Sequence, residues 1–310
     1  MKPEMKRPPR SLCSLPPEGA SQGAWGGPAR TEIAALAPPV RSGVAAGTSY
    51  SVYAARAADA GKRATVVLIH GVGMNQSVWA PQVEALCAEF QVVVYDMLGH
   101  GRSALPSPAA RLDEYAAQLA QLLDTLDVEA AHVVGHSMGA LVALEFALTH
   151  PNRTLSVAAL NAVYDRTPQQ RQAVMSRAET LDDATFIPGI DATLSRWFGD
   201  PVPGHLTGAA QAVRTLLLSV DPIGYQRTYR LFASADGAHV GRLERLAVPA
   251  LFLTGEHDPN SSPAMSRAMA AAAPGGRAEI IANERHMMNV TEPALVNERL
   301  LAFLKGAHHG

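Results

Sequence analysis

Short apolar runs alternate along most of the chain with longer stretches in which apolar residues recur at helical spacing. The run 64–69 is almost continuously apolar, as expected for a strand that is buried on both faces of a sheet. In contrast, residues 112–126 carry leucines and a tyrosine at intervals of three and four, which predicts an amphipathic helix. Such alternation favours a mostly parallel central sheet with helices on both faces.

The same reading predicts each element of the sheet and its helices. We expect strands at 50–55, 64–69, 92–95, 132–134, 155–160, 248–253 and 278–281, the first of them at an edge. Helices are expected around 83–90, 112–126, 141–149, 264–273 and 296–304, where apolar stripes have the helical period.

The alternation is missing from two parts of the chain. Residues 162–246 are helical and irregular, with proline and glycine breaks, which predicts a helical cap inserted into an α/β core at 41–161 and 247–306. Residues 1–40 are rich in proline and lack apolar periodicity, so we expect a disordered N-terminal extension.

Composition limits the kinds of molecule that this chain is expected to bind. With 47% hydrophobic and 17% charged residues it should fold, and a net charge of -2 gives no reason to expect nucleic acid or an anionic membrane as a partner. Cys13 and Cys87 do not form a disulfide framework, and no apolar run has the length of a membrane span. We therefore expect a cytoplasmic protein that binds a small molecule, and the sequence leaves open whether it forms an oligomer.

Gly135-His136-Ser137-Met138-Gly139 is the strongest chemical motif. This G-x-S-x-G pattern follows a predicted strand and opens a predicted helix, which is the context of a nucleophile elbow. The turn points a serine hydroxyl at solvent, and the glycines allow the strand and helix backbones to pass closely. Ser137 is therefore the candidate nucleophile, and the alternative is a serine that only caps the helix.

A serine hydroxyl needs a base, and the base needs a carboxylate that orients it. Asp258 follows the strand expected at 248–253, and His286 follows the strand expected at 278–281, so both lie at the carboxyl edge of the sheet. We assign His286 as the base and Asp258 as the acid of a Ser-Asp-His triad.

Other residues compete for these two roles. Glu256 and Asp165 are alternative acids, although neither lies at the tip of the turn that holds Asp258. His257 is an alternative base, but it directly precedes Asp258 and cannot fold back onto it.

An oxyanion hole needs two donors near the nucleophile. The elbow provides the backbone N–H of Met138, and the turn His70-Gly71-Val72-Gly73 leaves the Val72 N–H free to point into the site. The alternative is an ordinary glycine turn.

The neighbours of these groups are candidates for contact with the substrate. We select His70, Gly71 and His136 as substrate-binding residues, with the alternative that His136 only shapes the elbow. No phosphate loop, dinucleotide fingerprint or metal-ligand spacing is present, so we expect neither a cofactor nor a metal ion.

Together these motifs make the chain from about residue 50 to 305 resemble the α/β-hydrolase superfamily, and in particular its small bacterial members with a helical cap. The motifs that carry the resemblance are His70-Gly71-Val72-Gly73, Asp96-Met97-Leu98-Gly99-His100-Gly101-Arg102-Ser103, the elbow, Gly255-Glu256-His257-Asp258 and His286. The resemblance implies a cofactor-free hydrolase similar to enol-lactone hydrolases, C–C hydrolases of aromatic ring-cleavage products, or hydrolases of acylaminomethylene-succinates. The chain departs from the family pattern around His286, where Arg285 precedes and Met287-Met288 follow, and this leaves the substrate open.

The predicted cap is rich in arginine, at positions 166, 171, 177, 196, 214, 227 and 230. An arginine that faces the site would suit a substrate carboxylate, whereas acidic neighbours in the same stretch could pair with most of them.

The sequence is compatible with three kinds of function. The first is hydrolysis of an ester, lactone, amide or C–C bond in a small catabolic substrate, and the second is a ligand receptor that keeps the triad but turns over slowly. The third is a lipase-like enzyme at an interface, for which Trp197, Phe198 and 216–218 give too small an apolar face.

Overall fold

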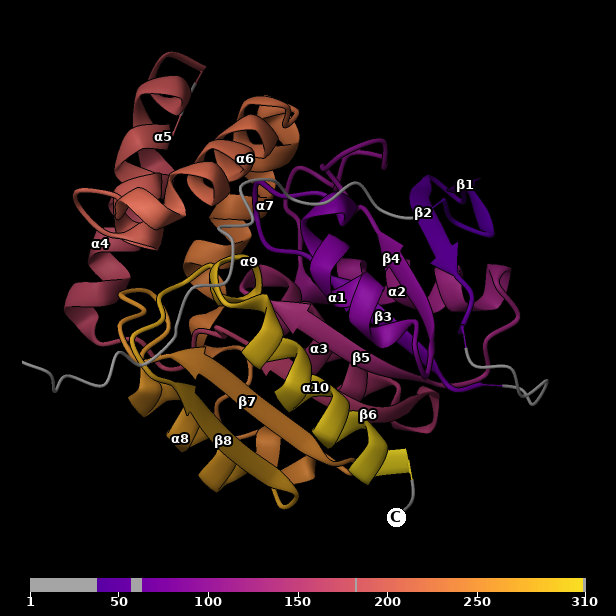
Figure 1. Cartoon of the computed structure of the whole chain (residues 1–310). Helices are drawn as coiled ribbons and strands as arrows, with labels where there is room; N and C mark the ends of the chain where they lie inside the picture. Colours follow the sequence, from indigo (N-terminus) through magenta and orange to yellow (C-terminus); the bar gives the residue numbers. More distant parts are fainter. Residues whose placement is uncertain (1–37, 57–62, 182, 309–310) are drawn as a thin grey trace, which may run out of the picture.

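The computed structural model describes residues 38–56, 63–181 and 183–308. The predicted disordered extension lies outside the described residues up to position 37. In the described part of the chain, eight strands form one sheet, in the order β1-β2-β4-β3-β5-β6-β7-β8 (Figure 1). Their bounds are β1 Arg41–Ala45, β2 Thr48–Tyr53, β3 Thr65–Ile69, β4 Gln91–Tyr95, β5 Ala131–His136, β6 Thr154–Leu160, β7 Ala250–Gly255 and β8 Gly276–Ile281.

The sheet is mostly parallel, as expected. From β4 to β8 every neighbouring pair is parallel, while β2 pairs with β4, and β1 with β2, in antiparallel register. The strand predicted at 50–55 is not the edge strand, because β1 lies outside it. β1 has the sequence RSGVA and a largely exposed surface, so it carries no apolar run that periodicity could detect.

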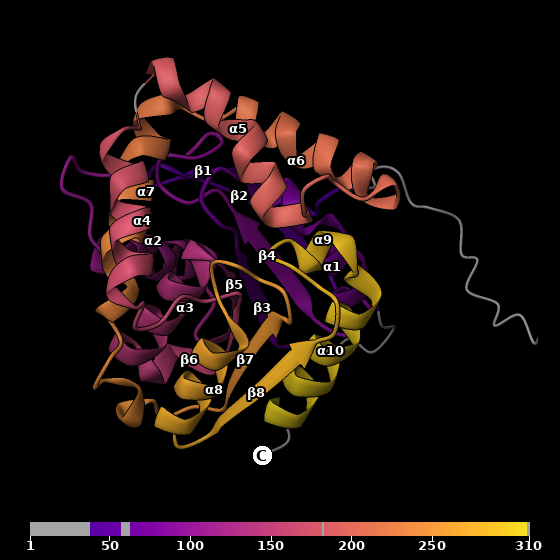
Figure 2. The same cartoon turned by 90° about the vertical axis from the view of Figure 1, so that its left-hand side faces the viewer.

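Helices cover both faces of the sheet (Figure 2). α1 Ala80–Leu86 and α10 Pro293–His308 lie on one face, and α2 Leu112–Thr125, α3 Met138–Thr149 and α8 Pro263–Ala272 lie on the other. The short helix α9 Met288–Thr291 leads into α10. The predicted helix at 83–90 ends earlier, because Cys87 is already its C-cap residue.

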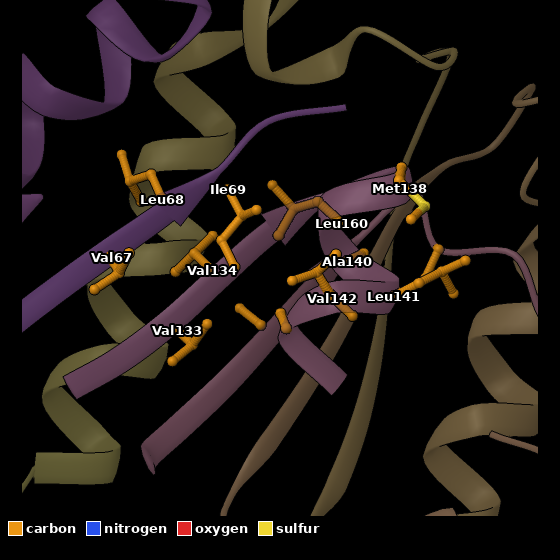
Figure 3. Packing of buried hydrophobic residues seen from close by; sticks show 14 of the residues in the cluster. Val67, Leu68, Ile69, Val133, Val134, Met138, Ala140, Leu141, Val142 and Leu160 are labelled. Carbon is orange, nitrogen blue, oxygen red and sulfur yellow. The ribbon is translucent and has the colours of Figure 1, made fainter. Parts of the chain in front are cut away.

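The centre of the core is the contact of β3 and β5 with α3 (Figure 3). Every residue of α3 from Met138 to Ala147 is buried, because the helix packs between the sheet and α2. A helix that is apolar on all sides belongs in such an interior position, and each fully buried leucine or phenylalanine contributes about 2 kcal/mol. The N-terminus of α3, where the elbow lies, is therefore held on a rigid support.

Helices α4 Pro168–Glu179, α5 Asp183–Phe198, α6 Thr207–Leu218 and α7 Pro222–Ser234 lie beyond the carboxyl ends of the parallel strands (Figures 1 and 2). We call residues 162–246, which contain these helices, the cap segment. Helix α4 packs on α7, and α5 packs on α6.

The two ends of the cap segment are joined at Asp236. Its backbone carbonyl accepts a hydrogen bond from the Asp165 N–H at 2.9 Å, and its carboxylate accepts one from the Arg166 N–H at 2.9 Å. The guanidinium of Arg171 also contacts this carboxylate, at 2.8 Å. The start and the end of the insertion therefore lie side by side.

A second cluster fastens the end of the cap segment to α3. The Glu145 carboxylate is buried and accepts two hydrogen bonds from the guanidinium of Arg242, at 2.9 and 3.0 Å. The His239 imidazole lies 3.2 Å from the same carboxylate. Burial alone would raise the pKa of Glu145, but His239 and Arg242 outweigh it and lower the pKa to about 2. The residues that follow α7 are thus tied to α3, which is buried in the core.

No helix in the described ranges combines the length and the apolar character needed to cross a membrane.

Candidate active site

Ser137, Asp258 and His286 come from loops that follow β5, β7 and β8, at the carboxyl edge of the sheet. Ser137 has φ 56° and ψ -116°, a conformation that L-residues rarely adopt and that a nucleophile elbow requires. A Cβ on Gly135 would collide with the Gly139 carbonyl, and a Cβ on Gly139 would collide with the Ile69 carbonyl. Both glycines are therefore needed for the close approach of strand and helix.

The three side chains form a continuous hydrogen-bonded chain. The His286 Nδ1 lies 2.8 Å from the Asp258 Oδ2, and the His286 Nε2 lies 3.2 Å from the Ser137 Oγ. Because an ionised carboxylate can only accept, Nδ1 carries the proton and Nε2 is free to accept one from the serine. All three residues are buried, so little solvent screens their interaction.

Asp258 stays ionised although it is buried. Burial alone would raise its pKa, but the His286 imidazole and several hydrogen bonds outweigh this effect and lower the pKa of Asp258. The Asn161 side-chain amide donates to the Asp258 Oδ2 at 2.8 Å, and the Asn260 backbone N–H donates to the Asp258 Oδ1 at 2.8 Å.

Asn161 is a site residue that the sequence analysis missed. It directly follows β6, is fully buried, and has φ 51°, a left-handed conformation that asparagine tolerates well. The available signal was a polar residue at the carboxyl end of a predicted strand, next to the strand that precedes Asp258.

The competing residues lie elsewhere. Glu256 accepts a hydrogen bond from the Asn283 N–H, and the His257 side chain is about half exposed. Asp165 lies near the start of the cap segment, where its N–H donates to the Asp236 carbonyl. Among the described residues, the carboxylate that contacts His286 is that of Asp258.

The turn after β3 passes directly beside Ser137. A Cβ on Gly71 would lie 3.1 Å from the Ser137 Cβ, and the Gly73 N–H donates to the His100 Nε2 at 3.0 Å. Within the described ranges, neither the Val72 N–H nor the Met138 N–H has a hydrogen-bond acceptor in the protein. These are the two donors that the sequence analysis selected, and Figure 3 shows Met138 at the start of α3.

Histidines hold this turn in place. His70 donates from Nδ1 to the Gly71 carbonyl at 2.8 Å and accepts from the Met97 N–H at Nε2, 3.0 Å away. Burial lowers the pKa of His70 to about 4, and burial together with the neighbouring His70 lowers that of His100 to about 3. Both imidazoles are therefore neutral, and each connects the turn after β3 to the loop after β4 through hydrogen bonds.

His70, Gly71 and His136, which were predicted to bind substrate, are not among the residues that line the cavity above Ser137. The His136 Nε2 donates to the His286 carbonyl at 2.8 Å, and burial followed by the proximity of His286 lowers the pKa of His136 to about 3. His136 and His70 are both buried, and their hydrogen bonds hold the His286 backbone and the turn after β3.

A cavity of about 200 Å³ lies between Ser137 and the cap segment. Val72, Ser137, Asn260 and His286 line it from the core side. Trp197 of α5 lines it from the cap side, and the centres of the Trp197 and His286 rings are 5.4 Å apart. Among the described residues, no group of His, Cys, Asp or Glu side chains is arranged to hold a metal ion.

Three arginines of the cap segment also line this cavity. Arg166 is buried and is paired with Asp236 at 3.4 Å. Arg177 instead donates to the Tyr229 hydroxyl at 3.2 Å, and Arg196 donates to the Thr193 hydroxyl at 2.8 Å. In the described part of the chain neither Arg177 nor Arg196 has a carboxylate partner. Burial, and the nearby charge of Arg177, lower the pKa of Arg196.

Residues 64–293 match the family described as alpha/beta hydrolase fold. A relative from Acinetobacter baylyi, an (E)-2-((N-methylformamido)methylene)succinate hydrolase, is 37% identical over 247 residues, which cover 80% of this chain and 92% of the relative. The 3-oxoadipate enol-lactonase 1 of the same organism is 27% identical, over 77% of this chain and 88% of its own length. The crystal structure of an enol-lactonase from Burkholderia xenovorans LB400 is 28% identical, with a TM-score of 0.74, and covers 86% of this chain and 100% of that one.

The chain therefore belongs to the α/β-hydrolase family. Its relatives and its fold show that it is a hydrolase.

Proposed function

We propose that this protein is a serine hydrolase that cleaves an amide or ester bond in a small substrate bearing a carboxylate. The observation that carries the proposal is the hydrogen-bonded chain from Ser137 through His286 to Asp258 at the floor of a cavity whose cap side holds Arg177 and Arg196. The first part accounts for the chemistry and the second for the substrate.

In this mechanism the Ser137 Oγ attacks the acyl carbon while the His286 Nε2 takes its proton. The Val72 and Met138 N–H groups donate to the oxyanion, and His286 then returns the proton to the leaving group as the acyl–heteroatom bond breaks. His286 next takes a proton from a water molecule that attacks the acyl carbon, and it returns this proton to the Ser137 Oγ as the bond between Oγ and the acyl carbon breaks and the acid product leaves. Asp258 accepts the hydrogen bond from the His286 Nδ1–H throughout and offsets the charge of the imidazolium.

Arg177 and Arg196 support an acidic substrate. Both guanidinium groups are partly buried and lack a carboxylate partner among the described residues, and a planar carboxylate on the substrate would satisfy either of them with two parallel hydrogen bonds. The similarity to an (E)-2-((N-methylformamido)methylene)succinate hydrolase supports the same reading, since a succinate carries two carboxylates and a formamido group is an amide.

Two substrates test the proposal separately for chemistry and for charge. We expect p-nitrophenyl acetate, which is neutral, and mono-p-nitrophenyl succinate, which carries a carboxylate, both to be hydrolysed. Ser137→Ala and His286→Ala should each lower kcat/KM for both substrates by about 10³-fold or more. Arg177→Met and Arg196→Met should lower kcat/KM for the succinate ester by about 10-fold to 100-fold and leave the acetate nearly unchanged.

Arg214→Met is the matched control, because Arg214 lies in the cap segment but pairs with Asp191 and does not line the cavity. Full activity of Ser137→Ala would disprove the mechanism. Equal losses on both esters in the Arg177 and Arg196 variants would disprove the carboxylate site. A wild-type protein that turns over neither ester would instead favour the receptor hypothesis.

A further inference from the structure

A second cavity, of about 250 Å³, lies inside the cap segment between α4, α5, α6 and α7. We call it the cap chamber. It shares part of its wall with the cavity above Ser137, and the shared residues are Arg177, Thr193, Arg196, Tyr225 and Tyr229. The two cavities therefore adjoin, and the arginine pair lies at their boundary.

Beyond this boundary the wall of the cap chamber is largely apolar. Leu181, Ile190, Ala192 and Leu217 line the chamber and not the cavity above Ser137. The Tyr225 and Tyr229 rings stack 5.8 Å apart on its border, and Ile190 and Leu217 are almost fully buried. Such a surface gains free energy when an apolar group displaces water from it.

We infer that the cap chamber is a second substrate subsite, which binds an apolar substituent of an acid whose carboxylate lies between Arg177 and Arg196. This inference rests on the proposed function, because Ser137 then faces the acyl bond on one side of the arginine pair. The apolar group extends from the other side, so the preferred substrate carries its acyl bond, its carboxylate and its hydrocarbon part in that order.

Straight-chain carboxylates probe the chamber without requiring turnover. Isothermal titration calorimetry with butanoate, hexanoate and octanoate should show Kd falling about threefold to fourfold for each added CH₂, until the chamber is full. Butanoate reports mainly on the arginine pair, and the increment from butanoate to octanoate reports on the chamber.

Two variants fill the chamber from its outer side. Ala192→Phe adds bulk at an exposed position of the wall, and Gly189→Leu adds a side chain where a Cβ would meet nothing within 4 Å. Both should remove the increment beyond butanoate. Leu217 and Tyr225 are avoided, because they also contact the position of Gly73 beside Val72.

Gly306→Leu is the control for Gly189→Leu, because Gly306 also lies in a helix with open space around its Cβ, far from the chamber in α10. It should bind all three acids as the wild type does. An octanoate affinity no greater than that of butanoate would mean that the chamber is only an entry passage and would overturn the inference. So would a full increment in both filling variants. Neither result depends on ester hydrolysis, so the inference can fail while the proposed chemistry stands.

Discussion

A single buried carboxylate, that of Asp258, accepts hydrogen bonds from the His286 ring, the Asn161 amide and the Asn260 backbone. Each donor favours the ionised form, and together they reverse the effect of burial on the pKa of Asp258. The ionised form is the one that keeps a proton on the His286 Nδ1. The environment of Asp258 is therefore part of the proposed mechanism, although His286 is the one of these donors that also contacts the Ser137 hydroxyl.

Replacing Asn161 tests this environment. Asn161→Gly accepts the left-handed backbone but removes the amide, so we expect kcat to fall about 10-fold and the pKa of Asp258 to rise. A group whose pKa is lowered by folding works above that pKa and fails as the pH falls through it. The acid limb of the kcat profile should therefore move to higher pH in this variant.

Asn283→Gly is the matched control, since Asn283 is also an asparagine with positive φ, at 61°, but lies in an exposed loop. It should keep the wild-type profile. An unchanged acid limb in Asn161→Gly would show that the amide does not position Asp258.

Some residues of the candidate site could be predicted from the sequence and others could not, and the difference is whether the residue stands in a local motif. Ser137, Asp258 and His286 each stand in a local motif at the end of a predicted strand, and the structure places them within hydrogen-bond distance of one another. Asn161 has no local motif, because its contact with Asp258 exists only through the pairing of β6 with β7. Selecting Arg177 and Arg196 from the nine arginines of the cap segment likewise requires knowledge of how its helices pack, which periodicity alone does not give.

At the scale of elements, the junction of β5 and α3 leaves no space for a side chain at Gly135. A Cβ on Gly135 would overlap the backbone of Gly139 and Ala140, and both chains there are buried in the core. Gly135→Ala should lower the free energy of unfolding by about 2 kcal/mol or more, because neither backbone can move aside without repacking. Urea denaturation followed by circular dichroism measures this change.

The control for that substitution is Gly306→Ala in α10, where a Cβ meets nothing within 4 Å. Alanine has the higher helix propensity, so this variant should be stabilised by up to about 1 kcal/mol. Equal stability of Gly135→Ala and wild type would contradict the steric account of the elbow.

The elements that periodicity predicted best are those whose neighbours are all apolar. β3, β5 and α3 are buried on every side, and their sequences show it directly. β1 was missed because an exposed edge strand needs no apolar residues. The last strand residue of β5, His136, was missed because its imidazole is buried by a specific hydrogen bond and not by an apolar preference.

At the scale of the whole molecule, the cluster at Glu145 joins the cap segment to the core. Glu145→Gln should lower the free energy of unfolding by about 2 kcal/mol at pH 7, since it leaves Arg242 and buried His239 without their carboxylate. The pKa of Glu145 is lowered from 4.5 to about 2, so the stability it contributes is present above pH 4.5 and is lost as the pH falls towards 2.

The difference between wild type and Glu145→Gln should therefore shrink as urea denaturation is repeated from pH 7 to pH 3. Glu89→Gln is the control, because Glu89 makes an exposed pair with Lys305, and it should change stability little at any pH. A difference that stays constant with pH would mean that Glu145 does not act through its charge.

Asp236 has a consequence for the ancestry of this chain. Asp236, near the end of the cap segment, binds both Asp165 and Arg166 near its start, so about seventy residues, most of them helical, leave the core and return to it at a single point. A gene rearrangement that removed or exchanged the residues between these positions would need only a short connection between the two ends. It would leave β5, β7, β8 and the residues that follow them unchanged. Proteins that share this core can thus acquire a different cap segment, and with it a different substrate, while they keep the same residues at the carboxyl edge of the sheet.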